Sequence, residues 1–175
     1  MRRMFILLFC AALIAFVPPL TTQPASAGPQ GKLVYWVMAD LVRGSIQPTG
    51  TVCVQTNVFK HGEEVVWRVK VLEVSTSEDP GDNGKNPTAI EERGIKVTAY
   101  LENGMSFPLR YGRHPGRGEP AAWFWATGWK VPDDFPIGRL KWWLVVTDKT
   151  SAFVRFDPIG SGANLPAPPI IIERR

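Results

Sequence analysis

Cysteine is scarce in this chain: of 175 residues, only Cys10 and Cys53 are cysteines. Cys10 lies in an N-terminal apolar run that we expect to be removed, so the folded protein keeps one cysteine and forms no internal disulfide. Stability must then come from packing, to which the seven tryptophans bring large apolar surfaces. Cys53 lies in a strand-like run, and we expect it to be a small buried side chain within a sheet. A thiol that reacts or pairs between chains is the alternative.

A strong excess of charge is also missing. The formal net charge is +4, and removal of Arg2 and Arg3 with the N-terminal run lowers it to +2. Such a nearly balanced surface gives no indication of a nucleic acid or an anionic membrane as partner.

Motifs that carry chemistry are absent as well. There is no Gly-x-Ser-x-Gly sequence, and the paired acids lie in predicted turns, where carboxylates are usually solvated. The two histidines, His61 and His114, lie in predicted loops, and Cys53 does not have the neighbours of a copper or covalent haem site. The polar loop over residues 79–83 lacks the full ligand order of a calcium site. We therefore expect no catalytic residue, no cofactor and no metal.

Residues 1–27 have the pattern of a cleavable signal peptide. A short positive start precedes an apolar run from Phe5 to Val17, and Ala25-Ser26-Ala27 supplies small residues for cleavage. The apolar run is shorter than the roughly 20 residues that a membrane-spanning helix needs. We therefore expect cleavage after Ala27, no membrane span afterwards, and a periplasmic or secreted protein. General secretory and twin-arginine export both remain open.

Helical periodicity is nearly absent after the signal. Runs of β-branched and aromatic residues recur instead, and the alternation is clearest where Val65, Trp67 and Val69 point one way and Arg68 and Lys70 the other. The polar stretch between the third and fourth runs predicts a surface loop over Ser75–Arg93. The predicted strands are Lys32–Met38, Val52–Phe59, Val65–Val74, Ile95–Leu101, Met105–Tyr111, Ala122–Trp129, Leu140–Thr147 and Ala152–Phe156, with Ile170–Ile172 as a final strand or an extended tail.

Short strands at this spacing predict an all-β fold. We expect an immunoglobulin-like antiparallel β-sandwich of about seven to eight strands over residues 28–158, followed by a Pro/Gly-rich C-terminal arm over residues 159–175. A barrel is the alternative. The runs Val65–Val71 and Leu140–Val146 favour the sandwich because they have the pattern of central strands in two facing sheets.

Several turns carry a resemblance to a known group of modules. Gly62-Glu63 opens a predicted core strand, and Asn103-Gly104 marks a hairpin. A Pro-x-x-x-Pro-x-Gly turn over residues 132–138 precedes the strand that ends at Thr147-Asp148. Over roughly residues 55–158 this series resembles bacterial extracytoplasmic immunoglobulin-like or fibronectin type III-like modules. The resemblance implies the fold and not a particular function, because adhesins, chaperones, enzyme subunits and sugar binders share this architecture.

The tryptophans outnumber what one small core is expected to bury. Trp67 is predicted to anchor the core, whereas Trp142 and Trp143 point in opposite directions, so one of them is expected to leave it. We expect the surplus indoles to form an exposed aromatic surface for a partner or ligand, with long covering loops as the alternative. The predicted binding residues are Trp123, Trp125, Trp129 and Trp143, with Tyr111 and Arg113 on the adjacent loop.

These features predict a non-enzymatic, exported immunoglobulin-like interaction module. Its expected partner is another extracytoplasmic protein, to which it docks as an accessory subunit. The alternative is a carbohydrate-binding module, in which Trp123 and Trp125 stack on the sugar rings of a polysaccharide. A second alternative is a redox-active or metal-associated protein that uses Cys53 and the histidines.

Overall fold

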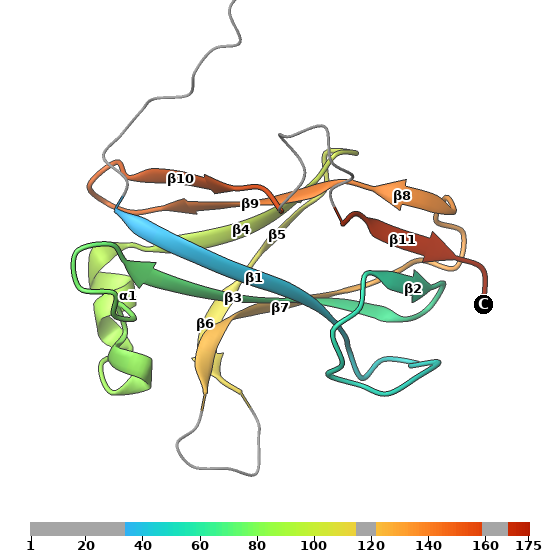
Figure 1. Ribbon diagram of the computed structural model, residues 1–175, viewed down its shortest axis with the longest axis horizontal. Coiled ribbons are helices and arrows are strands. Elements are labelled where there is room, and N and C mark those ends of the chain that lie inside the picture. Colours follow the sequence, from blue (N-terminus) through green and yellow to red (C-terminus); the bar gives the residue numbers. More distant parts are fainter. Residues whose placement is uncertain (1–33, 115–121, 159–167) are drawn as a thin grey trace, which may run out of the picture.

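The computed structural model describes residues 34–114, 122–158 and 168–175 (Figure 1). The predicted signal peptide and most of the predicted C-terminal arm lie outside these residues. Within them strands are the main regular structure and the one α-helix is short, as expected for an all-β fold, and no helix is long and apolar enough to cross a membrane.

Eleven strands, one turn of 3-10 helix and one short α-helix make up the described part of the chain. Their bounds are β1 (Tyr35–Arg43), β2 (Val58–Lys60), β3 (Glu64–Glu73), η1 (Asp82–Gly84), α1 (Thr88–Arg93), β4 (Lys96–Leu101), β5 (Ser106–Pro108), β6 (Arg110–Arg113), β7 (Trp123–Lys130), β8 (Gly138–Leu140), β9 (Trp142–Thr147), β10 (Phe153–Phe156) and β11 (Ile170–Glu173).

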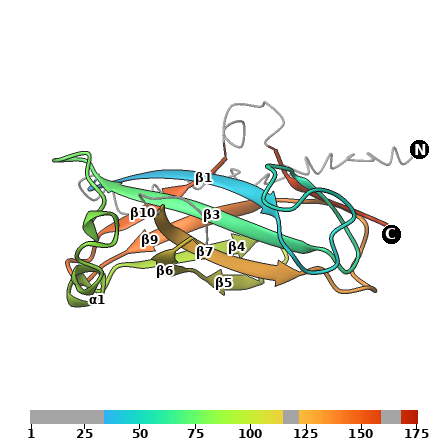
Figure 2. The same ribbon diagram turned by 90° about the horizontal axis from the view of Figure 1, so that it is seen from below.

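Two four-stranded antiparallel sheets form the body of the protein. Their strand orders are β1-β3-β7-β6 and β10-β9-β4-β5. The inward side chains of both sheets belong to one buried cluster, so the sheets lie against each other as layers (Figure 2). The chain passes from one sheet to the other between β5 and β6 at Leu109, which is buried and donates its N–H to the Val97 carbonyl at 2.8 Å.

Strand β3 shows why these residues fold as they do. Val65, Trp67, Val69 and Val71 are all buried, while the alternate residues are only partly covered. This confirms the predicted alternation and the prediction of Trp67 as a core anchor.

A third, three-stranded sheet of order β2-β11-β8 closes one end of the molecule. Strand β11 pairs in parallel with β2 and antiparallel with β8. Ile170 and Ile172 of β11 are buried in the common core. The described end of the predicted arm is therefore a strand of the folded protein, so of the two alternatives for Ile170–Ile172, a final strand or an extended tail, the structure has the strand.

The prediction of a single strand over Val52–Phe59 is wrong. Cys53 is exposed and has a positive φ of 58°, so it lies in a turn and is not a buried residue of a sheet. Residues 53–56 pair with the end of β1 instead: the Cys53 N–H donates to the Arg43 carbonyl at 2.8 Å. The apolar pattern misled because a short β-branched run fits equally well in a loop held against an edge strand.

The predicted loop over Ser75–Arg93 contains both η1 and α1. It packs back onto the body of the protein, and Gly84 is needed there for two reasons. Its φ is +87°, and a Cβ at this position would overlap the ring of Trp123. This loop therefore covers one of the indoles that the sequence predicted to be exposed.

Candidate functional site

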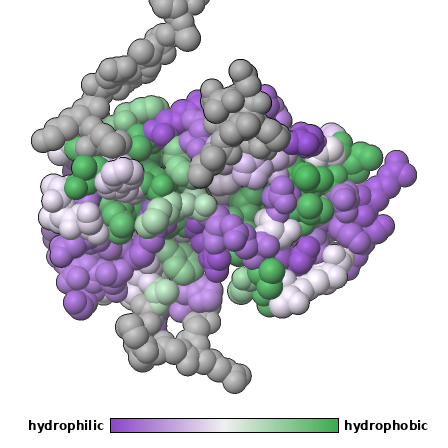
Figure 3. All heavy atoms as spheres, viewed as in Figure 1, coloured by the Kyte–Doolittle hydropathy of each residue, from purple (hydrophilic) through white to green (hydrophobic). Residues whose placement is uncertain are grey.

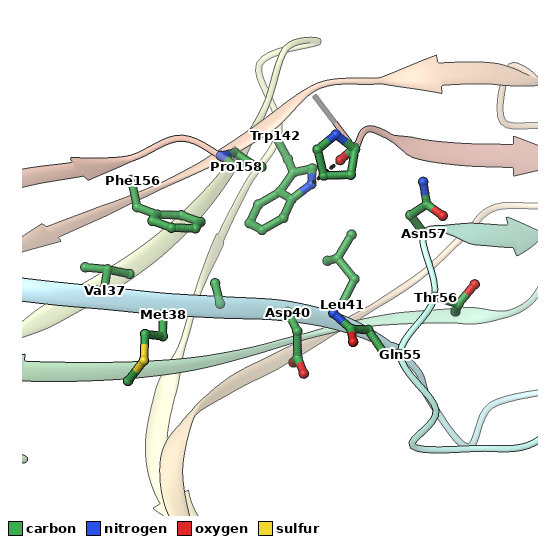
Figure 4. A pocket seen from close by; sticks show the side chains of 12 residues that line it. Val37, Met38, Asp40, Leu41, Gln55, Thr56, Asn57, Trp142, Phe156 and Pro158 are labelled. Carbon is green, nitrogen blue, oxygen red and sulfur yellow. Dashed lines mark hydrogen bonds between the residues drawn. The ribbon is translucent and has the colours of Figure 1, made fainter. Parts of the chain in front are cut away.

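A groove of about 680 Å³ opens where β1 and β10 lie at the edges of the two larger sheets. Val37 and Leu41 point into it from β1, and Trp142 and Phe156 face them from β9 and β10 (Figure 4). We call this site the β1 groove. Its described lining comprises Val37, Met38, Ala39, Asp40, Leu41, Gln55, Thr56, Asn57, Trp142, Phe156, Pro158 and Pro168.

Strand β1 leaves part of its backbone beside this groove without a partner among the described residues. Its even-numbered residues pair with β3, as shown by the bond from the Gly44 N–H to the Glu64 carbonyl at one end and from the Val74 N–H to the Val34 carbonyl at the other. In an antiparallel ladder the odd-numbered residues must then direct their N–H and C=O groups outward.

Only the end of that outward edge has a partner among the described residues. The Arg43 N–H donates to the Val54 carbonyl at 3.2 Å, and the Leu41 carbonyl accepts the Thr56 N–H at 3.0 Å. No described strand pairs with the outward groups of Val37 and Ala39. An unpaired strand edge is a ready template for another extended chain.

Exposed apolar side chains gather on the same strand and the loop that follows it. Trp36 and Met38 of β1 are 56% and 53% exposed, and their side chains leave the strand on the side opposite to those of Val37 and Leu41. Among the described residues, five of the seven exposed large hydrophobic side chains fall between residues 36 and 54. Hydrophobic side chains are visible on the face that carries β1 and β10 (Figure 3). Such a concentration is typical of interaction surfaces.

The charges next to the β1 groove are already paired. Asp40 is the one charged residue of the described lining, and its Oδ1 accepts a hydrogen bond from Arg68 Nε at 2.9 Å. The hydrogen bonds from Arg68 to Asp40 raise the pKa of the guanidinium above its ordinary value. At the β10 side, Arg155 makes two hydrogen bonds of 2.8 Å to Asp157. The groove therefore offers an apolar surface without a free charge in its described lining.

A buried carboxylate holds the loop that forms one wall of the groove. Glu63 is fully buried and accepts hydrogen bonds from the Thr49 N–H at 2.6 Å, the Thr49 hydroxyl at 2.7 Å and the Lys60 N–H at 2.8 Å. Arg43 Nε lies 3.0 Å from it. Burial alone would raise the pKa of Glu63, but these hydrogen bonds and the nearby guanidinium outweigh burial and hold the pKa below its ordinary value of 4.5. Glu63 thus fixes the loop that leads to Gln55 and Asn57.

A second polar cluster holds the start of β1 against the other sheet. The Tyr35 hydroxyl donates to Asp148 Oδ2 at 2.7 Å, and Arg93 Nη2 donates to the same hydroxyl at 3.2 Å. Burial, helped by the bond to Asp148, raises the pKa of Tyr35 to about 12. Burial alone would raise the pKa of Asp148, but hydrogen bonds from Tyr35, Thr150 and Ala152 outweigh it and lower that pKa.

Three of the six binding residues predicted from sequence come together. Tyr111 packs against Trp123 and Trp125, with ring centroids 5.4 and 5.5 Å apart. The Tyr111 hydroxyl donates to Asp79 at 2.7 Å. Trp125 is only 4% exposed, so this cluster is largely an inner surface that the loop with η1 covers.

The other three predicted residues lie apart from that cluster or at its rim. Arg113 lies opposite Trp123 in the pairing of β6 with β7. Trp129 is 6% exposed and packs against Phe107 and Phe135.

Trp143 lies on the outer face of the second sheet, between a cation and an aromatic ring. Its ring centroid is 5.9 Å from that of Tyr100 and 4.6 Å from the Arg155 guanidinium carbon. Because β9 lies between β4 and β10, these two neighbours approach the indole from opposite sides. The four predicted tryptophans therefore do not form one exposed strip.

The residues of the β1 groove were not selected from sequence. One signal was present: the run from Tyr35 to Ala39 is apolar on both faces of a strand, which requires either cover on both faces or an exposed apolar face. Trp142 and Phe156 carried no signal of their own, because their position across the groove depends on the sheet topology.

Among the described residues, no group of three or more His, Cys, Asp and Glu side chains is placed to hold a metal ion. Asp79 of the polar loop is bound by Lys70 Nζ at 2.6 Å and by Tyr111, so its oxygens have protein partners. His61 directs its Nε2 to the Phe135 carbonyl at 2.8 Å.

Comparison with family models, with curated proteins and with solved structures gave no match for this chain. Function is therefore inferred from the groove and from the free edge of β1.

Proposed function

We propose that this chain is an exported, non-enzymatic immunoglobulin-like module that docks onto another extracytoplasmic protein by adding an extended segment of that protein to β1. The observation that carries this proposal is the outward N–H and C=O groups of Val37 and Ala39, which have no described strand beside them. Strand addition satisfies such groups with backbone hydrogen bonds, and adjacent pockets then select side chains.

The strand order supports an immunoglobulin-like module. Across the first sheet, the order β1-β3-β7-β6 is the order expected of strands A, B, E and D in such a domain. Across the second sheet, the order β10-β9-β4-β5 is the order expected of strands G, F, C and C′. The central disulfide of antibody domains has no counterpart, and Trp67 with its buried valine neighbours provides the packing instead.

A binding role agrees better with the β1 groove than catalysis does. Its described lining holds one carboxylate, Asp40, and that group is paired with Arg68. General acid–base chemistry needs a titratable group free to approach the substrate. The signal-like residues 1–27 support a location outside the cytoplasm, where the docking partner is then found.

The other edge strands give less support for partner binding than β1. Strand β5 has three residues and ends in Pro108, and β6 and β10 have four residues each and carry Arg110, Arg113 and Arg155. Short length, proline and charge are the usual protections of a sheet edge. Strand β1 has nine residues and no proline, and its two charged residues, Asp40 and Arg43, are paired with Arg68 and Glu63. It is therefore the least protected of the four.

Carbohydrate binding has weaker support. Sugar stacking needs open ring faces, whereas Trp125 and Trp129 are buried and Trp143 lies between Tyr100 and Arg155. A redox or metal role rests on Cys53 alone, since no described cluster of ligands accompanies it.

Site-specific photocross-linking in the exported, full-length protein tests the docking proposal. A photoreactive residue at Trp36 is expected to capture one extracytoplasmic protein. The matched control is the same residue at Ile137, which is also 56% exposed but lies away from β1, and it is expected not to capture that protein.

Ala39→Pro then tests the backbone edge. It removes an N–H that points away from β3, so the sheet should be retained while capture is lost. Met38→Pro removes an N–H of the β3 ladder and should instead destabilise the fold. Equal capture from both positions, or undiminished capture by a folded Ala39→Pro variant, would contradict the proposal.

A further inference from the structure

A small residue lies at the centre of the β1 groove. Ala39 points inward between Val37 and Leu41, and its neighbour in the ladder is the buried Val69 of β3. Trp142 and Phe156 of the other sheet face its two inward neighbours, Val37 and Leu41 (Figure 4), and line the same groove as Ala39. A larger side chain at residue 39 would fill the space between the two sheets, so alanine is what leaves the groove open.

A strand added to β1 brings its own side chains into that space. Its inward side chains would be about 7 Å apart, because successive residues of a strand rise about 3.3 Å and alternate between faces. A segment of about five residues spans about 13 Å. Its backbone would bond to Val37 and Ala39, because the Leu41 carbonyl already accepts the Thr56 N–H. One inward side chain of such a segment must therefore lie beside Ala39.

Charge and polarity limit what that side chain can be. The sole carboxylate of the described lining belongs to the Asp40–Arg68 pair, so a buried charge would have no free counter-charge there. Trp142 Nε1 already donates to the Pro168 carbonyl at 3.3 Å, and Asn57 Nδ2 donates to the Pro169 carbonyl at 3.2 Å. The surface left at the centre of the groove is aliphatic and aromatic.

We propose, building on the docking function above, that the partner presents an uncharged extended segment of about five residues whose central side chain is a large aliphatic or aromatic group held between Ala39, Trp142 and Phe156. Residue 39 is then the position that determines specificity. The backbone of Val37 and Ala39 supplies affinity for any extended chain, and the space above Ala39 selects which segment is bound.

Selection of segments from a library of random ten-residue peptides, displayed on phage and presented to the intact exported protein, tests this inference. Selected peptides are expected to share one large apolar residue with uncharged residues two positions before and after it. Ala39→Leu is expected to weaken binding of a selected peptide by about tenfold or more, since it fills the groove and keeps the N–H. Ala39→Gly, which also keeps the N–H and adds no bulk, is expected to bind as well as the wild type.

The outcomes separate this inference from the docking function. If selected peptides accept aspartate or lysine at the central position, or if folded Ala39→Leu binds unchanged, the assignment of the central side chain is wrong while strand addition stands. If no peptide is selected and the partner is still captured after Ala39→Pro, both proposals fail. Near-ultraviolet circular dichroism of each variant verifies that the fold is intact.

Discussion

The two sides of the space between the larger sheets differ in how they are filled. On the side of β5 and β7, rings pack without a break: the centroids of Trp67 and Phe107 are 5.2 Å apart, those of Phe107 and Trp129 5.8 Å, and those of Trp129 and Phe135 5.0 Å. On the side of β1 and β10, walls that also carry aromatic rings, those of Trp142 and Phe156, leave a groove of about 680 Å³.

This difference shows that aromatic content alone does not mark a binding surface. Trp129 and Trp142 are both 6% exposed, yet one belongs to a filled core and the other to the wall of a groove. The groove exists because Ala39 is small and because β1 has no described neighbour on its outer edge. Packing density and strand pairing, which are properties of the fold, separate the two regions.

Truncation of a tryptophan should have its largest effect on the filled side. Trp67→Ala is expected to lower the free energy of unfolding by about 3–5 kcal/mol, because it leaves a cavity in a fully packed core. Trp36→Ala, on the exposed face of β1, is expected to change it by less than about 0.5 kcal/mol. Urea denaturation of both variants measures the contrast. Similar losses in the two variants would show that β1 is buried in a way that the described residues do not account for.

The stability of the loop that forms one wall of the β1 groove should depend on the buried carboxylate of Glu63. Glu63→Gln is expected to lower the free energy of unfolding by about 2–4 kcal/mol at neutral pH, since Arg43 loses its counter-charge and the loop loses an acceptor. Glu64→Gln, at the partly exposed neighbouring residue, is the matched control and should cost less than about 1 kcal/mol.

The pH dependence of that effect has a defined sign. The folded-state pKa of Glu63 lies below 4.5, so its contribution is fully present above that pH and decreases as the pH falls through the lowered pKa. Denaturation curves of the wild type and of Glu63→Gln should therefore converge in acid. A constant difference between them down to pH 2 would contradict the assignment.

The smallest effect on the free energy of unfolding is expected from loss of the hydrogen bond between Tyr35, at the start of β1, and Asp148. Asp148→Asn should lower the free energy of unfolding by about 1 kcal/mol at pH 7 and lower the pKa of Tyr35 from about 12. Because the pKa of Asp148 is itself lowered, the stabilisation is present above its ordinary value of 3.8 and decreases as the pH falls through the folded-state pKa. Ultraviolet titration against a Tyr35→Phe reference follows the phenol, and an unchanged titration would contradict the contact.

Much of the framework could be predicted from sequence, because alternation reports burial directly. The alternation of Val65, Trp67 and Val69 predicted strand β3 and which of its faces is buried. The hairpin predicted at Asn103-Gly104 agrees with the antiparallel pairing of β4 with β5. Cys53 was misjudged because its apolar neighbours belong to a loop that pairs with the end of β1.

The candidate site could not be predicted in the same way. The exposure of an indole depends on which loop covers it, and the contact of Gly84 with Trp123 is a property of the folded chain. The outer edge of β1 likewise depends on the strand order, which places no described strand beside it, and no residue type signals that order. Only the two-sided apolar run of Tyr35–Ala39 pointed there.

Hydrogen exchange of single amides in β1, followed by nuclear magnetic resonance, tests the central claim most directly. The N–H groups of Met38 and Asp40 pair with β3, whereas those of Val37 and Ala39 point outward, so neighbours in one strand serve as controls for each other. In the isolated exported protein, Val37 and Ala39 are expected to exchange about a hundredfold faster or more than Met38 and Asp40, and to become protected when a selected peptide binds. Equal protection of all four amides in the isolated protein would mean that the edge is already paired, and would contradict the account.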